Sequence, residues 1–135
     1  MEIINPEIYK KYDIRGLYPE HVNQESITPV INACGQIFTT GKIVVARDGR
    51  HGSEELANHA AKLFHSFKKD FTVVNVGLAT TPMFYFLVNG LAASGGIMVT
   101  ASHKPKSYNG LKIVGPCAVM MSGSEIKEFI VSQSN

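Results

Sequence analysis

The chain has 135 residues, of which 44% are hydrophobic, and its formal net charge is +2. A charge this small does not support nucleic-acid binding, and the basic residues gather in three motifs instead of along one helix face. The longest apolar stretch, residues 83–88, is far too short to cross a membrane. Cys34 and Cys117 have neither metal-ligand spacing nor a disulfide framework, and the N-terminal segment lacks the pattern of a signal peptide. A single cytoplasmic domain over residues 1–135 is therefore expected.

The first half of the chain predicts a helix, a strand and a second helix. Residues 26–39 carry apolar side chains at helical spacing, and the continuous apolar run 43–46 predicts a buried strand. Ser53 is expected to cap the next helix, because acidic residues follow it in the first turn. The apolar stripe of this second helix is formed by Leu56, Ala60, Leu63, Phe64 and Phe67.

The second half predicts strands at 71–76, 96–100 and 111–114, together with two helices. A short helix is expected over 82–88, with Thr81 as its cap and Pro82 at the first helical position. The last helix is expected to be capped near Ser124. The strands are apolar on both faces, as expected when helices cover both sides of a sheet. The sequence therefore predicts an α/β fold, a three-layer α/β/α sandwich with a mixed, largely parallel sheet of about four main strands.

The segment between residues 100 and 112 carries the strongest chemical signal. Ser102 follows an apolar strand, in a proline-closed loop whose basic neighbours include His103, Lys104 and Lys112. A hydroxyl in such surroundings suits the transfer of a phosphoryl group, because basic side chains can neutralise the phosphate charge. The same segment also fits a polar turn between two antiparallel strands, with Asn109-Gly110 as a hairpin signal.

Two further motifs set arginine beside aspartate and glycine. Arg15 lies in the segment Tyr12-Asp13-Ile14-Arg15-Gly16, and the run Arg47-Asp48-Gly49-Arg50 follows the first predicted strand. Arginine makes planar, bidentate contacts with phosphate oxygens, although either motif could also be a surface ion pair in a turn. The second motif and the serine loop both follow strands, and open α/β sheets bind ligands at the carboxyl ends of their strands.

In this order the three motifs resemble those of the N-terminal domain of the α-D-phosphohexomutases, the phosphomannomutase and phosphoglucomutase family. That family carries a Tyr-Asp-Ile-Arg-Gly segment, an Arg-Asp-x-Arg segment and a Thr-Ala-Ser-His-Asn-Pro loop closed by Asn-Gly-x-Lys. The resemblance runs from about Tyr12 to Lys112, and the serine loop is its most specific part. One position departs from the family, because Lys104 stands where asparagine is usual.

The resemblance implies that Ser102 is a phosphoserine, which donates its phosphate to a sugar monophosphate and takes the other phosphate back from the bisphosphate intermediate. It implies catalytic roles for His103, Lys112 and Arg15, with Arg15 as an electrostatic clamp and Lys112 as a candidate acid or base. A further set of residues is implied to hold the loop and the phosphate: Arg47, Asp48, Arg50, Lys104, Asn109 and Gly110.

The resemblance also implies partners for this domain. Magnesium would take only the phosphoryl oxygen on Ser102 from this chain, with its other ligands from a domain absent here, and a sugar 1,6-bisphosphate would act as activator. The substrate would be a hexose phosphate of the mannose or glucose type. The metal-binding, sugar-binding and C-terminal phosphate-binding domains are expected to be absent, so the isolated chain should be inactive or nearly so. A stand-alone sugar-phosphate-binding or regulatory interaction module is the alternative.

Overall fold

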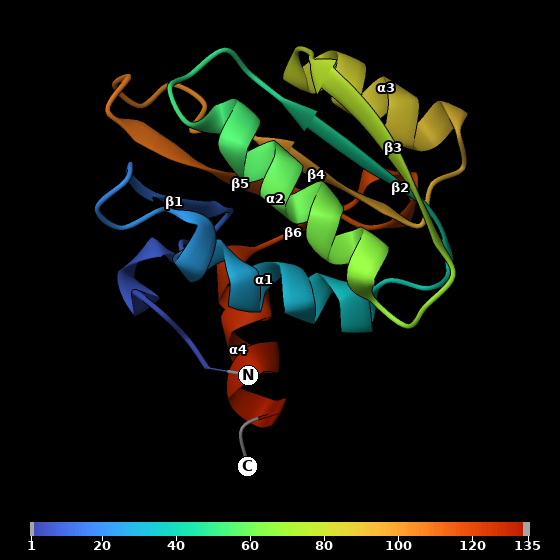
Figure 1. The fold of residues 1–135 in the computed structure, drawn as a ribbon, viewed down its shortest axis with the longest axis horizontal. Helices are drawn as coiled ribbons and strands as arrows, with labels where there is room; N and C mark the ends of the chain where they lie inside the picture. Colours follow the sequence, from blue (N-terminus) through green and yellow to red (C-terminus); the bar gives the residue numbers. More distant parts are fainter. Residues whose placement is uncertain (1, 134–135) are drawn as a thin grey trace.

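A mixed sheet of six strands forms the centre of the fold (Figure 1). The computed structural model describes residues 2–133. The spatial order of the strands is β1-β5-β4-β2-β3, with β6 also pairing with β5. The strands are β1 (Ile14–Leu17), β2 (Gly41–Arg47), β3 (Phe71–Leu78), β4 (Gly95–Val99), β5 (Tyr108–Val114) and β6 (Met120–Met121). The α-helices are α1 (Gln24–Ile37), α2 (Ser53–Ser66), α3 (Thr81–Gly90) and α4 (Gly123–Gln133).

The sheet has a parallel half and an antiparallel half. Strands β3, β2 and β4 run parallel to one another, whereas β5 is antiparallel to β4, β1 and β6. Arg47 and Val99 are register partners at the ends of β2 and β4. Consequently the Arg47–Arg50 segment and the serine loop leave the sheet side by side.

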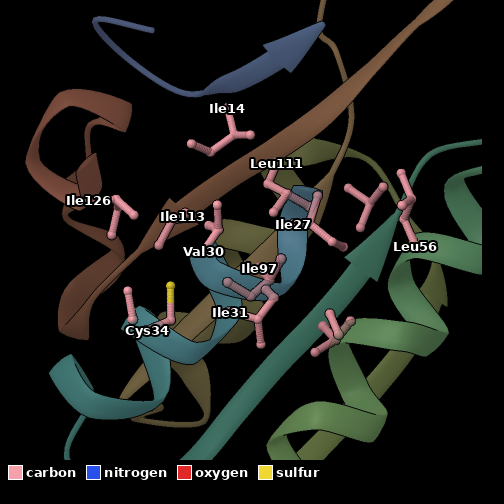
Figure 2. Close-up of a cluster of buried hydrophobic side chains, with 14 of the residues drawn as sticks. Ile14, Ile27, Val30, Ile31, Cys34, Leu56, Ile97, Leu111, Ile113 and Ile126 are labelled. Carbon is pink, nitrogen blue, oxygen red and sulfur yellow. The ribbon is translucent and has the colours of Figure 1, made fainter. Parts of the chain in front are cut away.

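Helices cover both faces of the sheet. One core lies between the sheet and helices α1, α2 and α4, and its labelled side chains in Figure 2 come from both the helices and the strands. A smaller core under α3 on the other face is built from Phe84, Val88, Val44, Ala46 and Met98. Because β2 and β4 contribute to both cores, their sequences are apolar on both faces. The predicted three-layer sandwich with a mixed sheet is confirmed, and the serine loop connects the antiparallel strands β4 and β5.

The sheet is larger than the four main strands that the sequence predicts. Strands β1 and β6 were not predicted: β1 is not a continuous apolar run, and β6 is only two residues long. Both exist through pairing along the same edge of β5: Ile14 lies opposite Leu111, and Met121 lies opposite Ile113. Strand β5 begins at Tyr108, so Asn109 and Gly110 lie inside a strand, and the hairpin interpretation of that pair is wrong.

Two predicted helix caps are wrong, and the third, expected near Ser124, lies two residues earlier. Thr80, not Thr81, caps α3 by accepting a hydrogen bond from the Met83 amide at 3.2 Å. At α2 the N-cap is Gly52, with a φ of 86° that favours glycine, and Ser53 is the first residue of the helix. At α4 the hydroxyl of Ser122 accepts from the Glu125 amide at 3.0 Å. Within residues 2–133, no helix combines the length and apolar character needed to span a bilayer.

Candidate functional site

A cleft of about 740 Å³ lies where β2 and β4 end. It brings together five of the predicted site residues: Arg15, Asp48, Ser102, His103 and Lys112. The remaining lining comes from three regions of the chain: Tyr12, Asp13, Thr81, Pro82, Tyr85 and Thr100. The predicted meeting of the Arg47–Arg50 motif and the serine loop at one sheet edge is therefore confirmed, and the first motif lines the same cleft.

Ser102 has an unusual backbone and an unpartnered hydroxyl. Its φ is 57°, in the left-handed region that L-residues other than glycine rarely adopt. The main-chain amide donates to Thr100 Oγ1 at 3.1 Å, which fixes the start of the loop. Ser102 Oγ is shielded from solvent and has no hydrogen-bond partner within the described residues. Backbone strain together with a buried unsatisfied polar atom is typical of functional positions.

The guanidinium of Arg50 holds the serine loop by its main chain. Nη2 donates to the carbonyl oxygens of Ser102 at 2.8 Å and Lys104 at 2.7 Å. Nη1 donates to those of Pro105 at 2.7 Å and Tyr108 at 3.2 Å. The planar fork of arginine thereby satisfies four carbonyl groups of one turn. Arg50 thus acts on the loop and not on the cleft, which it does not line.

Asp48 connects Arg50 to helix α2 and to β5. Its Oδ2 lies 3.2 Å from Arg50 Nε, while Oδ1 accepts from the Arg50 amide at 3.0 Å and from Ser53 Oγ at 2.6 Å. Ser53 Oγ accepts in turn from Asn109 Nδ2 at 3.0 Å. Asn109 is fully buried, and its Oδ1 accepts from the Gly110 amide at 2.8 Å. Asn109 and Gly110 therefore belong to the scaffold behind the loop.

Asp13 is a buried carboxylate in the wall of the cleft, with 4% of its surface exposed. Arg15 Nε lies 3.5 Å from Asp13 Oδ1, an ion pair without a hydrogen bond, since Oδ1 has no hydrogen-bond partner in residues 2–133. Burial raises the pKa of the Asp13 carboxyl, although the nearby cations of Arg15, Lys112, Lys10 and Lys104 act to lower it. Asp13 therefore sits at the centre of the basic groups of the site.

Two side chains that were expected to hold the loop and the phosphate, Arg47 and Lys104, make other contacts. Arg47 Nη2 lies 3.4 Å from Glu54 Oε2, and Nη1 donates to the Asp48 carbonyl at 3.3 Å. Lys104 Nζ lies 5.8 Å from the centre of the Tyr108 ring. Neither Arg47 nor Lys104 lines the cleft that contains Ser102.

The sequence analysis did not assign several residues of the cleft. Tyr12 and Asp13 lie in the same motif as Arg15, so their place in the sequence could have identified them as residues of the site. Thr81 and Tyr85 come from the first turns of α3. Their signal is weaker, because it requires knowing that α3 begins after β3 at the same sheet edge.

Comparison with known proteins agrees with this geometry. A family model described as phosphoglucomutase/phosphomannomutase, alpha/beta/alpha domain I, matches residues 6–133. The chain belongs to this family. The resemblance that the three motifs suggested is thereby confirmed, and the serine loop of this phosphoglucomutase/phosphomannomutase domain I lies in the cleft described above.

Individual relatives of the domain support the assignment. A phosphomannomutase of Klebsiella pneumoniae is 40% identical over 115 residues, which cover 85% of this chain and 72% of that protein. A phosphomannomutase of Escherichia coli is also 40% identical over 115 residues, covering 85% of this chain but only 25% of that protein. The crystal structure of a phosphoglucomutase/phosphomannomutase family protein from Burkholderia thailandensis superimposes with a TM-score of 0.79 at 30% identity, covering 98% of this chain and 31% of that one. This domain I chain therefore spans about a quarter of the E. coli relative.

Proposed function

We propose that this domain carries the phosphoserine of a hexose phosphate mutase, and that Ser102 is the residue that is phosphorylated. The observation that carries the proposal is the unpartnered Ser102 hydroxyl beside a cleft lined by Arg15, His103 and Lys112. The names of the relatives, phosphomannomutase and phosphoglucomutase, give the substrate class as hexose phosphates. The complete protein would interconvert hexose 1-phosphate and hexose 6-phosphate through a sugar bisphosphate.

In the half-reaction, Ser102 Oγ forms a bond to the phosphorus of the bisphosphate while the bond from phosphorus to the sugar oxygen breaks. The serine proton leaves and the sugar oxygen takes up a proton, so a phosphoryl group and a proton exchange places. Arg15 is always protonated and would stabilise the charge on the transferring group. Lys112 and His103 are positioned in the same cleft and could hold the proton in transit.

Because Ser102 Oγ is shielded from solvent, this reaction requires the hydroxyl to turn toward the cleft. Water cannot reach the oxygen in this arrangement, although the residue as a whole is partly exposed. A rotation of the side chain about its Cα–Cβ bond would turn the hydroxyl toward the cleft, while Arg50 keeps the main chain of the loop in place. Catalysis by positioning and charge neutralisation requires such a fixed backbone.

Magnesium does not fit the described residues as a complete site. No group of three or more His, Cys, Asp or Glu side chains within residues 2–133 could hold a metal ion. A phosphorylated Ser102 would offer a single oxygen, whereas magnesium prefers six oxygen ligands in octahedral geometry. We therefore propose that the other ligands come from further domains, which also supply most of the sugar contacts, and that this chain alone has little or no turnover. The free thiols of Cys34 and Cys117 are compatible with the proposed cytoplasmic location.

The experiment is an intact-mass measurement before and after incubation with glucose 1,6-bisphosphate, with and without magnesium. We expect a gain of one phosphoryl group, about 80 Da, on the peptide that contains Ser102. Ser102→Ala should gain nothing under the same conditions. Phosphate on another serine would contradict the site. Saturable bisphosphate binding with no mass gain would favour a sugar-phosphate-binding module over the phosphotransfer domain.

A further inference from the structure

A second hollow, of about 450 Å³, lies next to the cleft and shares Arg15 with it. Its walls come from three segments: the short 3-10 helix η1 (Pro6–Ile8) and the residues after it, strand β1 with the turn that follows, and the serine loop. The side chains that give it its character are Glu7, Lys10, Arg15, His21, Lys104 and Tyr108. We call it the basic pocket.

Positive charge in the basic pocket is poorly compensated. Lys10, Arg15 and Lys104 face a single acidic lining residue, Glu7. Arg15 pairs with the buried Asp13, but neither Lys10 nor Lys104 forms an ion pair in the part of the chain that the structure describes. Like charges held close together repel one another, and a bound anion would relieve that repulsion.

Lys104 is directed to this pocket by the way its loop is held. Arg50 binds the Lys104 carbonyl at 2.7 Å, so the main chain at this position is fixed, and the Lys104 ammonium lies over the Tyr108 ring in the pocket wall. The residue is therefore absent from the lining of the Ser102 cleft and present in that of the basic pocket. The position at which this chain departs from the Thr-Ala-Ser-His-Asn-Pro pattern is the one that adds a cation here.

We propose that the basic pocket is an anion site that binds a phosphate dianion, either free or as the phosphate group of an ester. Arginine and lysine together match the charge and the acceptor oxygens of phosphate. The pocket volume exceeds that of one phosphate ion, so it also has room for an attached sugar. The inference does not depend on phosphorylation of Ser102, because Ser102 does not line this pocket.

The test is a titration of the ¹⁵N-labelled chain carrying Ser102→Ala, followed by amide chemical shifts at constant ionic strength. Inorganic phosphate should cause saturable shifts at Gly16 and Lys104, whereas chloride should not. Lys104→Asn should weaken binding about fivefold or more, because it removes one of the two lysine charges in the pocket that form no ion pair within the described residues. Lys106→Asn is the matched control: it makes the same charge change two residues away, outside both pockets, and should leave the affinity unchanged.

The Lys112→Gln variant distinguishes binding in the basic pocket from binding in the Ser102 cleft, because Lys112 lines only the cleft. Binding that survives Lys112→Gln and weakens in Lys104→Asn and Lys10→Gln supports the basic pocket. Binding lost in Lys112→Gln but kept in Lys104→Asn would place the anion in the Ser102 cleft and overturn the proposal, as would equal losses in Lys104→Asn and Lys106→Asn or no saturable shift. A tighter response to mannose 6-phosphate than to inorganic phosphate would identify the ester as the ligand, and equal responses would identify the free ion.

Discussion

The guanidinium of Arg50 donates a hydrogen bond to the main-chain carbonyl of Ser102 at 2.8 Å. A residue that follows β2 thereby fixes the conformation of the loop that follows β4. The side chain of Arg50 is only 15% exposed, and Asp48 holds it from the other side at 3.2 Å. The loop geometry at the proposed phosphorylation site is consequently set by a contact far away in the sequence.

Arg50→Lys should lower the free energy of unfolding by about 2 kcal/mol, because one ammonium cannot replace the fork that serves four carbonyl groups. Urea denaturation gives the stability, and amide hydrogen exchange should speed up at residues 102–108. The matched variant is Arg47→Lys, whose contacts are long and partly exposed and which should change stability by less than about 0.5 kcal/mol. Equal effects of the two variants would contradict the special role of Arg50.

Ser102→Gly should stabilise the domain by about 1 kcal/mol, because it relieves the left-handed φ of 57° and removes an unpartnered buried hydroxyl. The same variant should lose all phosphorylation. Ala92→Gly is the control, since Ala92 also has a positive φ, of 49°, but carries no hydroxyl. Ala92→Gly should raise the free energy of unfolding by a smaller amount, about 0.5 kcal/mol. A loss of stability in Ser102→Gly at the thermal or urea midpoint would show that the serine side chain supports the loop.

Gly110→Ala should lower the free energy of unfolding by about 3 kcal/mol, because the added methyl would overlap the Ile14 carbonyl oxygen on the neighbouring strand β1. The clash would push β1 away from β5 and with it Arg15, which lies opposite Gly110. Urea denaturation measures the cost, and faster amide exchange at residues 14–17 would show the displacement. Gly115→Ala, with open space around its Cβ position, should change stability by less than about 0.5 kcal/mol.

Asp13 should make stability fall with rising pH in the acid range. Burial raises the pKa of Asp13 above its ordinary value of 3.8, so the folded chain binds this proton more tightly than the unfolded chain. The resulting stabilisation is complete below about pH 3.8 and is lost as the pH rises through the raised pKa.

The check is a comparison of wild type with Asp13→Asn between pH 3 and 7, both by urea midpoint. Asparagine cannot ionise, so the stability of the variant relative to wild type should increase as the pH rises across this window. Asp70→Asn, at an exposed position, should run parallel to wild type. A difference that shrinks with rising pH would mean that the ion pair with Arg15 outweighs the burial of the carboxylate.

The sequence predicted those elements that local patterns determine. Apolar runs mark β2 and β4, because both faces of these strands are covered. The position of each motif directly after one of these strands placed Ser102 and Asp48 at one sheet edge. Strands β1 and β6 could not be found this way, since they depend on pairing with β5. The Ser53 cap was wrong for a related reason: the hydroxyl donates to Asp48 at 2.6 Å instead of capping its own helix.

Within the site, residue type predicted which chemical groups are present better than it predicted where each side chain points. Arg47 and Arg50 belong to one four-residue motif, yet one contacts helix α2 and the other holds the serine loop. The direction of Arg50 depends on the loop after β4, which the sequence does not place. Lys104 was predicted to approach the phosphate, and its position in the basic pocket depends on the same loop.

Asn109, Ser53 and Asp48 form a continuous hydrogen-bonded series from β5 to the segment that follows β2. Replacing one of the three residues leaves buried polar atoms without a hydrogen-bond partner, which destabilises the fold by about 1–3 kcal/mol. Replacing all three with apolar groups of similar shape can be nearly neutral. These positions therefore cannot drift independently over evolutionary time. Among natural descendants of this chain, changes at the three positions should be inherited as a set.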